Sequence, residues 1–93
     1  MIKNFRCKET ERLFYRQFSK RLPANIRRIG QRKLAILDAA ERLEDLSVPP
    51  GNYLEKLAGN LKEQYSIRIN KQWRICFRWS GGNAHEVEIT DYH

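Results

Sequence analysis

Three arginines recur at alternate positions in two neighbouring segments of the C-terminal third. Arg68 lies in the first segment, and Arg74 and Arg78 lie in the second. Alternate side chains of a strand share one face, so we expect these arginines to lie close together, with Ser66 and Cys76 between them. Guanidinium groups bind phosphate oxygens through paired hydrogen bonds, and like charges on neighbouring strands repel one another unless an anion joins them. The pattern therefore favours a phosphate-binding surface.

Two acidic residues in the next segment, Glu86 and Glu88, give the arginines another role. We expect both on the same face, where they can form ion pairs with arginines of the neighbouring strand. The sequence leaves both interpretations open, and the two are compatible if the glutamates neutralise only part of the positive charge.

The sequence ends with three titratable side chains, Asp91, Tyr92 and His93. Imidazole titrates near neutral pH, so Tyr92 and His93 can donate a proton to a departing 5′-oxygen while Asp91 orients the imidazole. Attack of an RNA 2′-hydroxyl on its own phosphate needs a base, an acid and a positive cradle, and no metal. The alternative is an idle histidine, since terminal residues are commonly exposed.

Other chemistries have little support in the residue pattern. No serine stands in a Gly-x-Ser-x-Gly motif, and there is no glycine-rich phosphate loop. Cys7 and Cys76 are far apart in the sequence, so we expect neither a metal cluster nor a disulfide framework. Cys76 is interpreted as a packing residue. We therefore expect no metal and no other cofactor.

The segments that carry the arginines have the period of β-strands. From residue 63 onward the apolar side chains recur at every second position, and they are Tyr65, Ile67, Ile69, Trp73, Ile75, Phe77, Trp79, Val87 and Ile89. Asn70-Lys71-Gln72 and Ser80-Gly81-Gly82-Asn83 are typical turns, the second because glycine accepts positive φ. The pattern predicts three consecutive antiparallel strands, each apolar on one face and polar on the other.

A short strand and two helices are expected before these strands. Residues 2–5 alternate as a first strand, residues 9–18 form a helix, and a second helix runs from about 26 to 43 or 46. Residues 53–62 are expected to be an ordered loop. Lys33 lies within the apolar stripe of the second helix, so its ammonium must reach water or meet a carboxylate. The order β-α-α-β-β-β predicts an α+β fold, with both helices on one face of an antiparallel sheet and the other face open to solvent.

Length and charge bound the class of protein. The 93 residues are the length of one domain, which we expect to span 1–93. No apolar run is long enough to cross a membrane and the start lacks a secretion signal, so we expect a cytoplasmic protein with no membrane partner. The net charge is +7, and residues 1–33 carry eleven Lys or Arg against two Glu. This favours an anionic partner such as nucleic acid, although arginines and lysines that merely solubilise helix faces are the alternative.

Three stretches of the chain resemble the HigB toxins of the RelE superfamily. They are the run from Gln64 to Phe77, the turn Pro50-Gly51-Asn52, and the terminal Asp91-Tyr92-His93. The resemblance extends over essentially the whole chain and implies a RelE-like compact domain of two helices against an antiparallel sheet. It also implies a toxin of a type II toxin–antitoxin system, an endoribonuclease that cleaves messenger RNA at the ribosomal A site.

The resemblance implies roles for individual residues. Arg74 would stabilise the scissile phosphate, and the three terminal residues would form the catalytic cluster, with His93 as the leading acid or base. Glu55 stands where some members have a histidine, and Ala58 where they have a lysine. The general base is then either Glu55 or the ribosome, which could orient the 2′-hydroxyl unaided. We assign RNA or phosphate binding to five further residues, Arg68, Arg78, Lys71, Lys56 and Lys62.

The implied partners are a cognate helix-turn-helix antitoxin of the HigA type, the 70S ribosome with its messenger RNA, and operator DNA bound through the toxin–antitoxin complex. We expect the antitoxin to contact Arg27, Arg28 and Arg32 in the basic first third. Two other functions stay open. One is a ParE-like toxin that inhibits DNA gyrase, and the other is a non-enzymatic module that binds nucleic acid or the antitoxin.

Overall fold

The computed structural model describes residues 1–17, 21–57 and 63–91 of the chain. Its elements are the α-helices α1 (Lys8–Phe14) and α2 (Ala24–Ala39), the 3₁₀-helices η1 (Leu43–Ser47) and η2 (Pro50–Asn52), and the strands β1 (Glu55–Lys56), β2 (Gln64–Arg68), β3 (Trp73–Ser80) and β4 (Asn83–Asp91). The four strands form one antiparallel sheet in the order β1-β2-β3-β4. The expected α+β class, with two helices and an antiparallel sheet, is confirmed.

The three long strands follow the alternation of the sequence. The β2–β3 turn is fixed by Asn70, whose side-chain oxygen accepts hydrogen bonds from the backbone N–H groups of Gln72 and Trp73, both at 2.8 Å. The β3–β4 turn uses Gly81 and Gly82 at φ 60° and 77°, a conformation that glycine adopts at no steric cost. Both turns and all three strands were predicted correctly, because the signals that define them are local.

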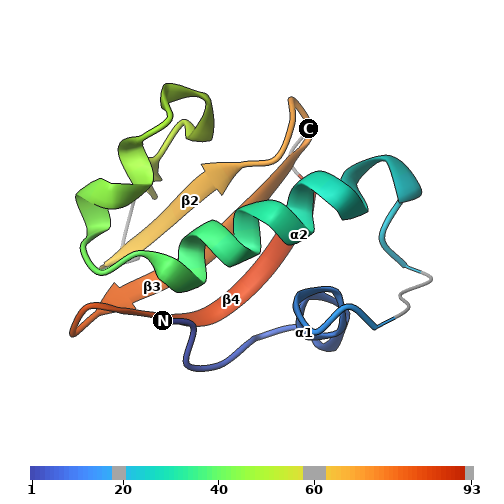
Figure 1. The fold of residues 1–93 in the computed structure, drawn as a ribbon, viewed down its shortest axis with the longest axis horizontal. Helices are drawn as coiled ribbons and strands as arrows, with labels where there is room; N and C mark the ends of the chain where they lie inside the picture. The colour runs from blue at the N-terminus through green and yellow to red at the C-terminus, as the bar shows by residue number, and fades with distance from the viewer. Residues whose placement is uncertain (18–20, 58–62, 92–93) are drawn as a thin grey trace.

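The apolar face of the sheet packs against the helices. α2 runs across this face, with α1 beside β4 (Figure 1). The buried hydrophobic residues that form the core are Leu13, Leu22, Ile26, Leu34, Leu37, Ala40, Leu46, Ile67, Ile69, Ile75, Phe77, Ala84, Val87 and Ile89. Burial of this apolar surface is the main free-energy gain of folding, and it determines which face of the sheet carries the polar residues.

Both helices are shorter than the sequence predicted. α1 stops at Phe14, because the chain leaves the helix through Arg16 at φ 60°. α2 stops at Ala39, because the Asp45 carboxylate accepts hydrogen bonds from the backbone N–H groups of Glu41 and Arg42 and starts a separate 3₁₀ turn. Side chains that compete for backbone hydrogen bonds end helices in this way.

The expected first strand at residues 2–5 is wrong in detail. The segment makes only two isolated parallel bridges, Ile2 with Ala84 and Phe5 with Val87. These bridges lie on the outer edge of β4, where Thr10 Oγ1 also accepts a hydrogen bond from the Ile89 N–H at 2.9 Å. The N-terminal segment therefore covers the edge of the sheet instead of extending it by a full strand.

The expected loop at 53–62 contains a strand. Glu55 and Lys56 form β1, which pairs with β2, while residues 58–62 lie outside the described residues. Ahead of this strand, the buried Asn52 donates to the Leu46 carbonyl at 3.1 Å and accepts from the ammonium of Lys33 on α2. The sequence left water and a carboxylate as alternatives for the Lys33 ammonium, and the structure gives it an amide oxygen instead, which ties the η1–η2 segment to α2.

Candidate active site

Arg74 is the centre of the polar face, and its guanidinium is held on several sides. Nε donates to Ser66 Oγ at 2.8 Å, and Nη2 donates to the carbonyl of Tyr53 at 2.5 Å. The residue is only 9% exposed. The side chain therefore reaches across β2 toward the start of β1, and these hydrogen bonds compensate the cost of burying a charge.

Glu55 completes the site from β1. Its carboxylate oxygen lies 3.8 Å from Nη1 of Arg74, and its side chain is 61% exposed. In the sheet, Glu55 pairs with Ser66, the same residue that accepts the hydrogen bond from Arg74. The structure thus brings together two of the expected site residues, the guanidinium of Arg74 and the carboxylate of Glu55, with the carboxylate open to solvent.

Arg68 lies directly opposite Arg74 in the β2–β3 register, as the alternation predicted. The two guanidinium groups have different partners. Arg68 Nε donates to the Asn70 carbonyl at 3.1 Å, and its guanidinium carbon lies 4.7 Å from the centroid of the Tyr53 ring. Protein groups therefore contact both guanidinium groups and offset part of the repulsion expected between neighbouring arginines.

The polar face is more covered than the sequence suggested. Ser66 is fully buried and Arg74 nearly so, because the chain segment at Tyr53 passes over them. Sequence reasoning expected this face to meet solvent and missed Tyr53 altogether. The signal that could have found it is the turn Pro50-Gly51-Asn52, which brings the chain back to the sheet immediately before Glu55.

Arg78 forms an ion pair with a glutamate of the next strand, the alternative to phosphate binding that the sequence left open. Its Nε lies 3.7 Å from the carboxylate of Glu86, which also pairs with Arg6 at 3.2 Å. Glu88 does not face an arginine in the register, since its β3 partner is Cys76. Arg78 is therefore the arginine that forms the expected cross-strand ion pair.

The expected lysines lie at the margins of this site. Lys71 is exposed in the β2–β3 turn, next to the row that contains Arg68 and Arg74. Lys56 is exposed on β1, but its register partner is Tyr65, which belongs to the apolar face. Lys62 lies outside the described residues.

The end of β4 lies beside Arg74. Thr90 is the register partner of Arg74, and Asp91 is the partner of Trp73. Asp91 therefore falls on the side of the apolar set and not on the polar face with Arg74, and its carboxylate accepts a hydrogen bond from Gln72 Nε2 at 3.2 Å. Tyr92 and His93 follow it and lie outside the described residues.

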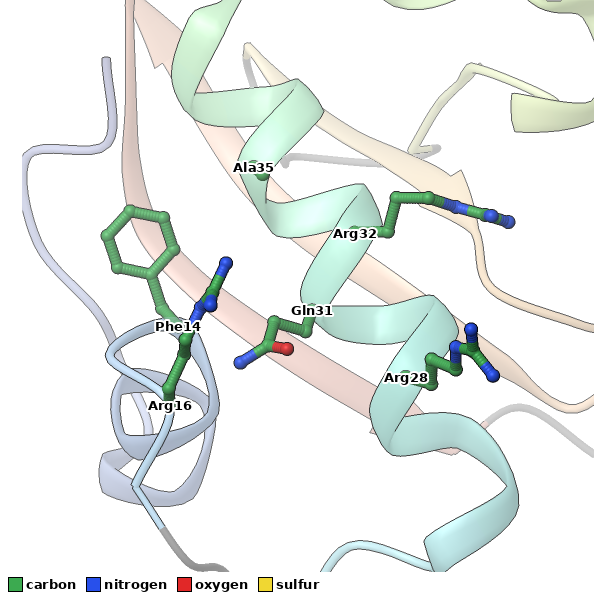
Figure 2. Close-up of a pocket in the computed structure, with 6 residues that line it drawn as sticks. All are labelled: Phe14, Arg16, Arg28, Gln31, Arg32 and Ala35. Atoms are coloured by element: carbon green, nitrogen blue, oxygen red, sulfur yellow. The ribbon is translucent and has the colours of Figure 1, made fainter.

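Two basic residues on the exposed side of α2 line a pocket in the helix layer. Arg28 and Arg32 line a pocket of about 440 Å³ with Phe14, Arg16, Gln31 and Ala35. The two arginines extend from one side of α2, while Phe14 and Arg16 lie on the other side, at the end of α1 (Figure 2). Arg27 does not line this pocket, and its Nε donates to the Leu22 carbonyl at 2.8 Å.

The described residues contain neither a metal-binding cluster nor a membrane-spanning helix. Within residues 1–17, 21–57 and 63–91, no group of three or more His, Cys, Asp or Glu side chains is placed to hold a metal ion. Over the same residues, no helix has the length and apolar character needed to cross a bilayer.

Comparison with known proteins identifies the fold and then the family. The YoeB–YefM complex from Staphylococcus aureus contains a chain that matches the whole of this one with a TM-score of 0.58, at 19% identity and over 98% of its own length. The family model of RelE-like toxins of the type II toxin–antitoxin system HigB matches residues 3–93. The chain belongs to this HigB-like toxin family.

Two relatives support the assignment. Toxin HigB-1 of Vibrio cholerae is 52% identical over 63 residues, which are 68% of this chain and 66% of that protein, just under two thirds. Endoribonuclease HigB of Proteus vulgaris is 33% identical over 94 residues, covering all of both chains. The resemblance read from the sequence is therefore confirmed at the level of the family.

Proposed function

We propose that this chain is an endoribonuclease toxin that cuts messenger RNA in the ribosomal A site. Membership of the HigB-like family supports the toxin assignment, and similarity to Endoribonuclease HigB of Proteus vulgaris supports the reaction. The observation that carries the proposal is the pairing of a fixed guanidinium, on Arg74, with an exposed carboxylate, on Glu55, at 3.8 Å. This is a phosphate ligand beside a proton acceptor.

The reaction needs no external nucleophile. The 2′-oxygen of the RNA forms a bond to the adjacent phosphorus, and the bond from phosphorus to the 5′-oxygen breaks. Glu55 accepts the 2′-hydroxyl proton, and His93 gives a proton to the departing 5′-oxygen. Nη1 of Arg74 stabilises the charge that develops on the phosphoryl oxygens. The products are a 2′,3′-cyclic phosphate and a 5′-hydroxyl end.

The position of β4 supports a role for the terminal residues. Thr90 lies opposite Arg74, and Tyr92 and His93 follow Thr90 by two and three positions in the sequence. Asp91, on the other side of the strand and bonded to Gln72, is proposed to fix the end of β4 rather than to orient the imidazole. Arg68 and Lys71 extend the positive surface along the RNA strand, with Arg78, Lys56 and Lys62 further from the reacting phosphate.

The proposed partners follow from the class of toxin. The chain acts on messenger RNA bound to the 70S ribosome, and a helix-turn-helix antitoxin of the HigA type holds it inactive and binds operator DNA with it. The antitoxin contacts α2 at Arg28 and Arg32, where the pocket beside Phe14 and Arg16 accepts an acidic segment. The cytoplasm, where ribosomes are, is the proposed location.

The test is to add purified protein to a translation extract and to map the 5′ ends of the transcript. Wild type is expected to produce in-frame cuts with 5′-hydroxyl ends, and to leave the same RNA intact without ribosomes. Replacing the base as Glu55→Gln or the acid as His93→Ala should each lower the cleavage rate by about 10²- to 10⁴-fold, the usual contribution of acid–base catalysis. Arg74→Lys should lower it by about 10²- to 10³-fold, because an ammonium cannot reproduce the guanidinium contacts.

Glu44→Gln is the matched control, since Glu44 is an exposed glutamate that pairs with an arginine elsewhere on the surface. It should cleave like the wild type. Thermal unfolding of the Arg74→Lys variant separates loss of catalysis from loss of the fold. Inhibition of DNA gyrase in a supercoiling assay, with no RNA cleavage, would instead favour the ParE-like function.

A further inference from the structure

Tyr53 combines a fixed backbone with an exposed ring. The residue is 53% exposed, although its neighbour Asn52 is fully buried and hydrogen-bonded to the Leu46 carbonyl. Its backbone has φ 45° and ψ 56°, the left-handed conformation that residues other than glycine and asparagine rarely adopt. Its carbonyl accepts the hydrogen bond from Arg74 Nη2. The fold therefore holds a strained aromatic residue in place beside the proposed phosphate ligand.

The ring of Tyr53 is held as well as its backbone. The guanidinium of Arg68 lies 4.7 Å from the ring centroid, and Arg68 Nε is anchored on the Asn70 carbonyl. A cation over one face of an aromatic ring is a favourable contact that limits rotation of both groups. The result is a flat, solvent-exposed aromatic surface of defined orientation.

We propose that the Tyr53 ring, supported by Arg68, is a stacking site for a nucleobase of the single-stranded RNA next to the phosphate held by Arg74. The inference rests on the proposed function, since it takes Arg74 as the phosphate ligand. Tyr53 would act on both the phosphate and the base of the nucleotide. Its carbonyl orients Arg74, the proposed phosphate ligand, and its exposed ring is available to the base. Unpaired bases bind proteins chiefly by stacking on aromatic side chains and guanidinium planes.

A purely structural role for Tyr53 is the competing explanation, and the choice of variant separates the two. Tyr53→Asn removes the ring but suits the left-handed backbone, so the hydrogen bond from Arg74 to the carbonyl is kept. Tyr53→Phe and Tyr53→Trp keep an aromatic face. Tyr15→Asn is the control, because Tyr15 is a similarly exposed tyrosine that follows α1 and whose ring contacts Phe5 and Phe14.

The experiment measures the cleavage rate and the apparent affinity for translating ribosomes in the extract described above. Tyr53→Asn is expected to lower kcat/KM by about 5- to 150-fold, the range of base–aromatic stacking. Tyr53→Phe and Tyr53→Trp should retain the wild-type rate, and Tyr15→Asn should change nothing. Arg68→Gln should also lower the rate. Its effect should be smaller in the Tyr53→Asn background than in the wild type, because the two residues act together.

The outcomes separate the inference from the function on which it rests. Wild type that does not cleave overturns both. Wild type that cleaves, with Tyr53→Asn equally active, overturns the stacking site alone. The stacking site is also overturned if Tyr53→Phe and Tyr53→Trp lose as much activity as Tyr53→Asn. The same holds if the loss of activity is accompanied by a lower unfolding temperature, because a structural role would produce either result.

Discussion

Two buried cations hold the segment between α2 and β1 from opposite sides of the sheet. Arg74 binds the carbonyl of Tyr53 from the polar face, and Lys33 donates to the side chain of Asn52 from the helix face. Consecutive residues of one short segment are therefore fixed by charged groups from β3 and α2. The position of Glu55, two residues further on, depends on both contacts.

Lys33→Met tests this arrangement at the level of one residue. Methionine fits the apolar stripe but leaves the buried Asn52 oxygen without its donor, so we expect the free energy of unfolding to fall by about 1–3 kcal/mol near neutral pH. Burial lowers the pKa of Lys33 below its ordinary value of 10.5, and the nearby Arg32 lowers it further.

The sign of the pH dependence follows from this shift. The unfolded chain binds the Lys33 proton more tightly than the native protein does, so the wild type gains stability as pH rises from the lowered pKa toward 10.5. The methionine variant lacks this gain, and the difference between the two proteins should widen with pH. Urea unfolding near neutral pH and at alkaline pH measures it. A difference that narrows as pH rises would contradict the assignment.

How well the sequence predicted the site differs from residue to residue. The alternation placed Arg68 beside Arg74 correctly, because period two is a property of the strand itself. It could not show that Arg74 is buried or that Glu55 faces it, since both depend on how the η2 segment returns to the sheet. Asp91 was expected to orient the imidazole of His93, although the alternation of Val87 and Ile89 continues to position 91 and places its side chain on the apolar side.

At the level of elements, the sequence predicted the strands that are defined by their own turns and missed the features that depend on distant partners. The glycine turn and the Asn70 turn fix β2, β3 and β4, and all were predicted. The ends of the helices depend on competing hydrogen bonds such as those of Asp45. β1 has two residues, too few for any period, and the bridges of Ile2 and Phe5 depend on partners more than 80 positions away.

Asp45→Asn tests the element that ends α2. Backbone hydrogen bonds from Arg42 and Glu41 lower the pKa of Asp45 below its ordinary value of 3.8, and the charge of Arg42 adds to this. The native carboxylate therefore contributes stability above pH 3.8 that is lost as pH falls through its lowered pKa. We expect Asp45→Asn to be less stable than wild type at neutral pH, with a difference that shrinks in acid.

Thermal unfolding at neutral and acid pH checks this expectation. Glu44→Gln is the control. Glu44 also pairs with Arg42, but the backbone N–H groups of Glu41 and Arg42 donate to Asp45. An Asp45→Asn difference that persists unchanged in acid would show that the carboxylate charge is not the cause.

At the level of the whole molecule, charge divides the proposed surfaces. Residues 1–33 carry most of the excess positive charge, and Arg16, Arg28 and Arg32 from this part line the pocket beside α2. The proposed active site lies on the polar side of the sheet, around Arg74 and Glu55. An acidic antitoxin segment can therefore be attracted to the helices through charge alone, before any contact with the RNA-binding residues.

The variant Arg28→Gln with Arg32→Gln tests the antitoxin surface. We expect weaker binding of the purified antitoxin and a smaller loss of affinity with added salt, because the screening length falls from about 10 Å at 0.1 M to about 3 Å at 1 M. Titration calorimetry across that range gives both quantities. Arg42→Gln, which removes an equally exposed arginine outside the pocket, is the control. Wild-type affinity that does not change with salt would rule out an electrostatic contact.

The closure of the sheet edge has a consequence for synthesis of the chain. Ile2 and Phe5 are each synthesised more than 80 positions before their bridging partners, Ala84 and Val87. The strand that contains those partners also supplies Thr90 opposite Arg74. A nascent chain that still lacks it can complete neither the edge nor the surroundings of the guanidinium. The sheet edge and the polar face around Arg74 are therefore both completed only once β4 has been synthesised.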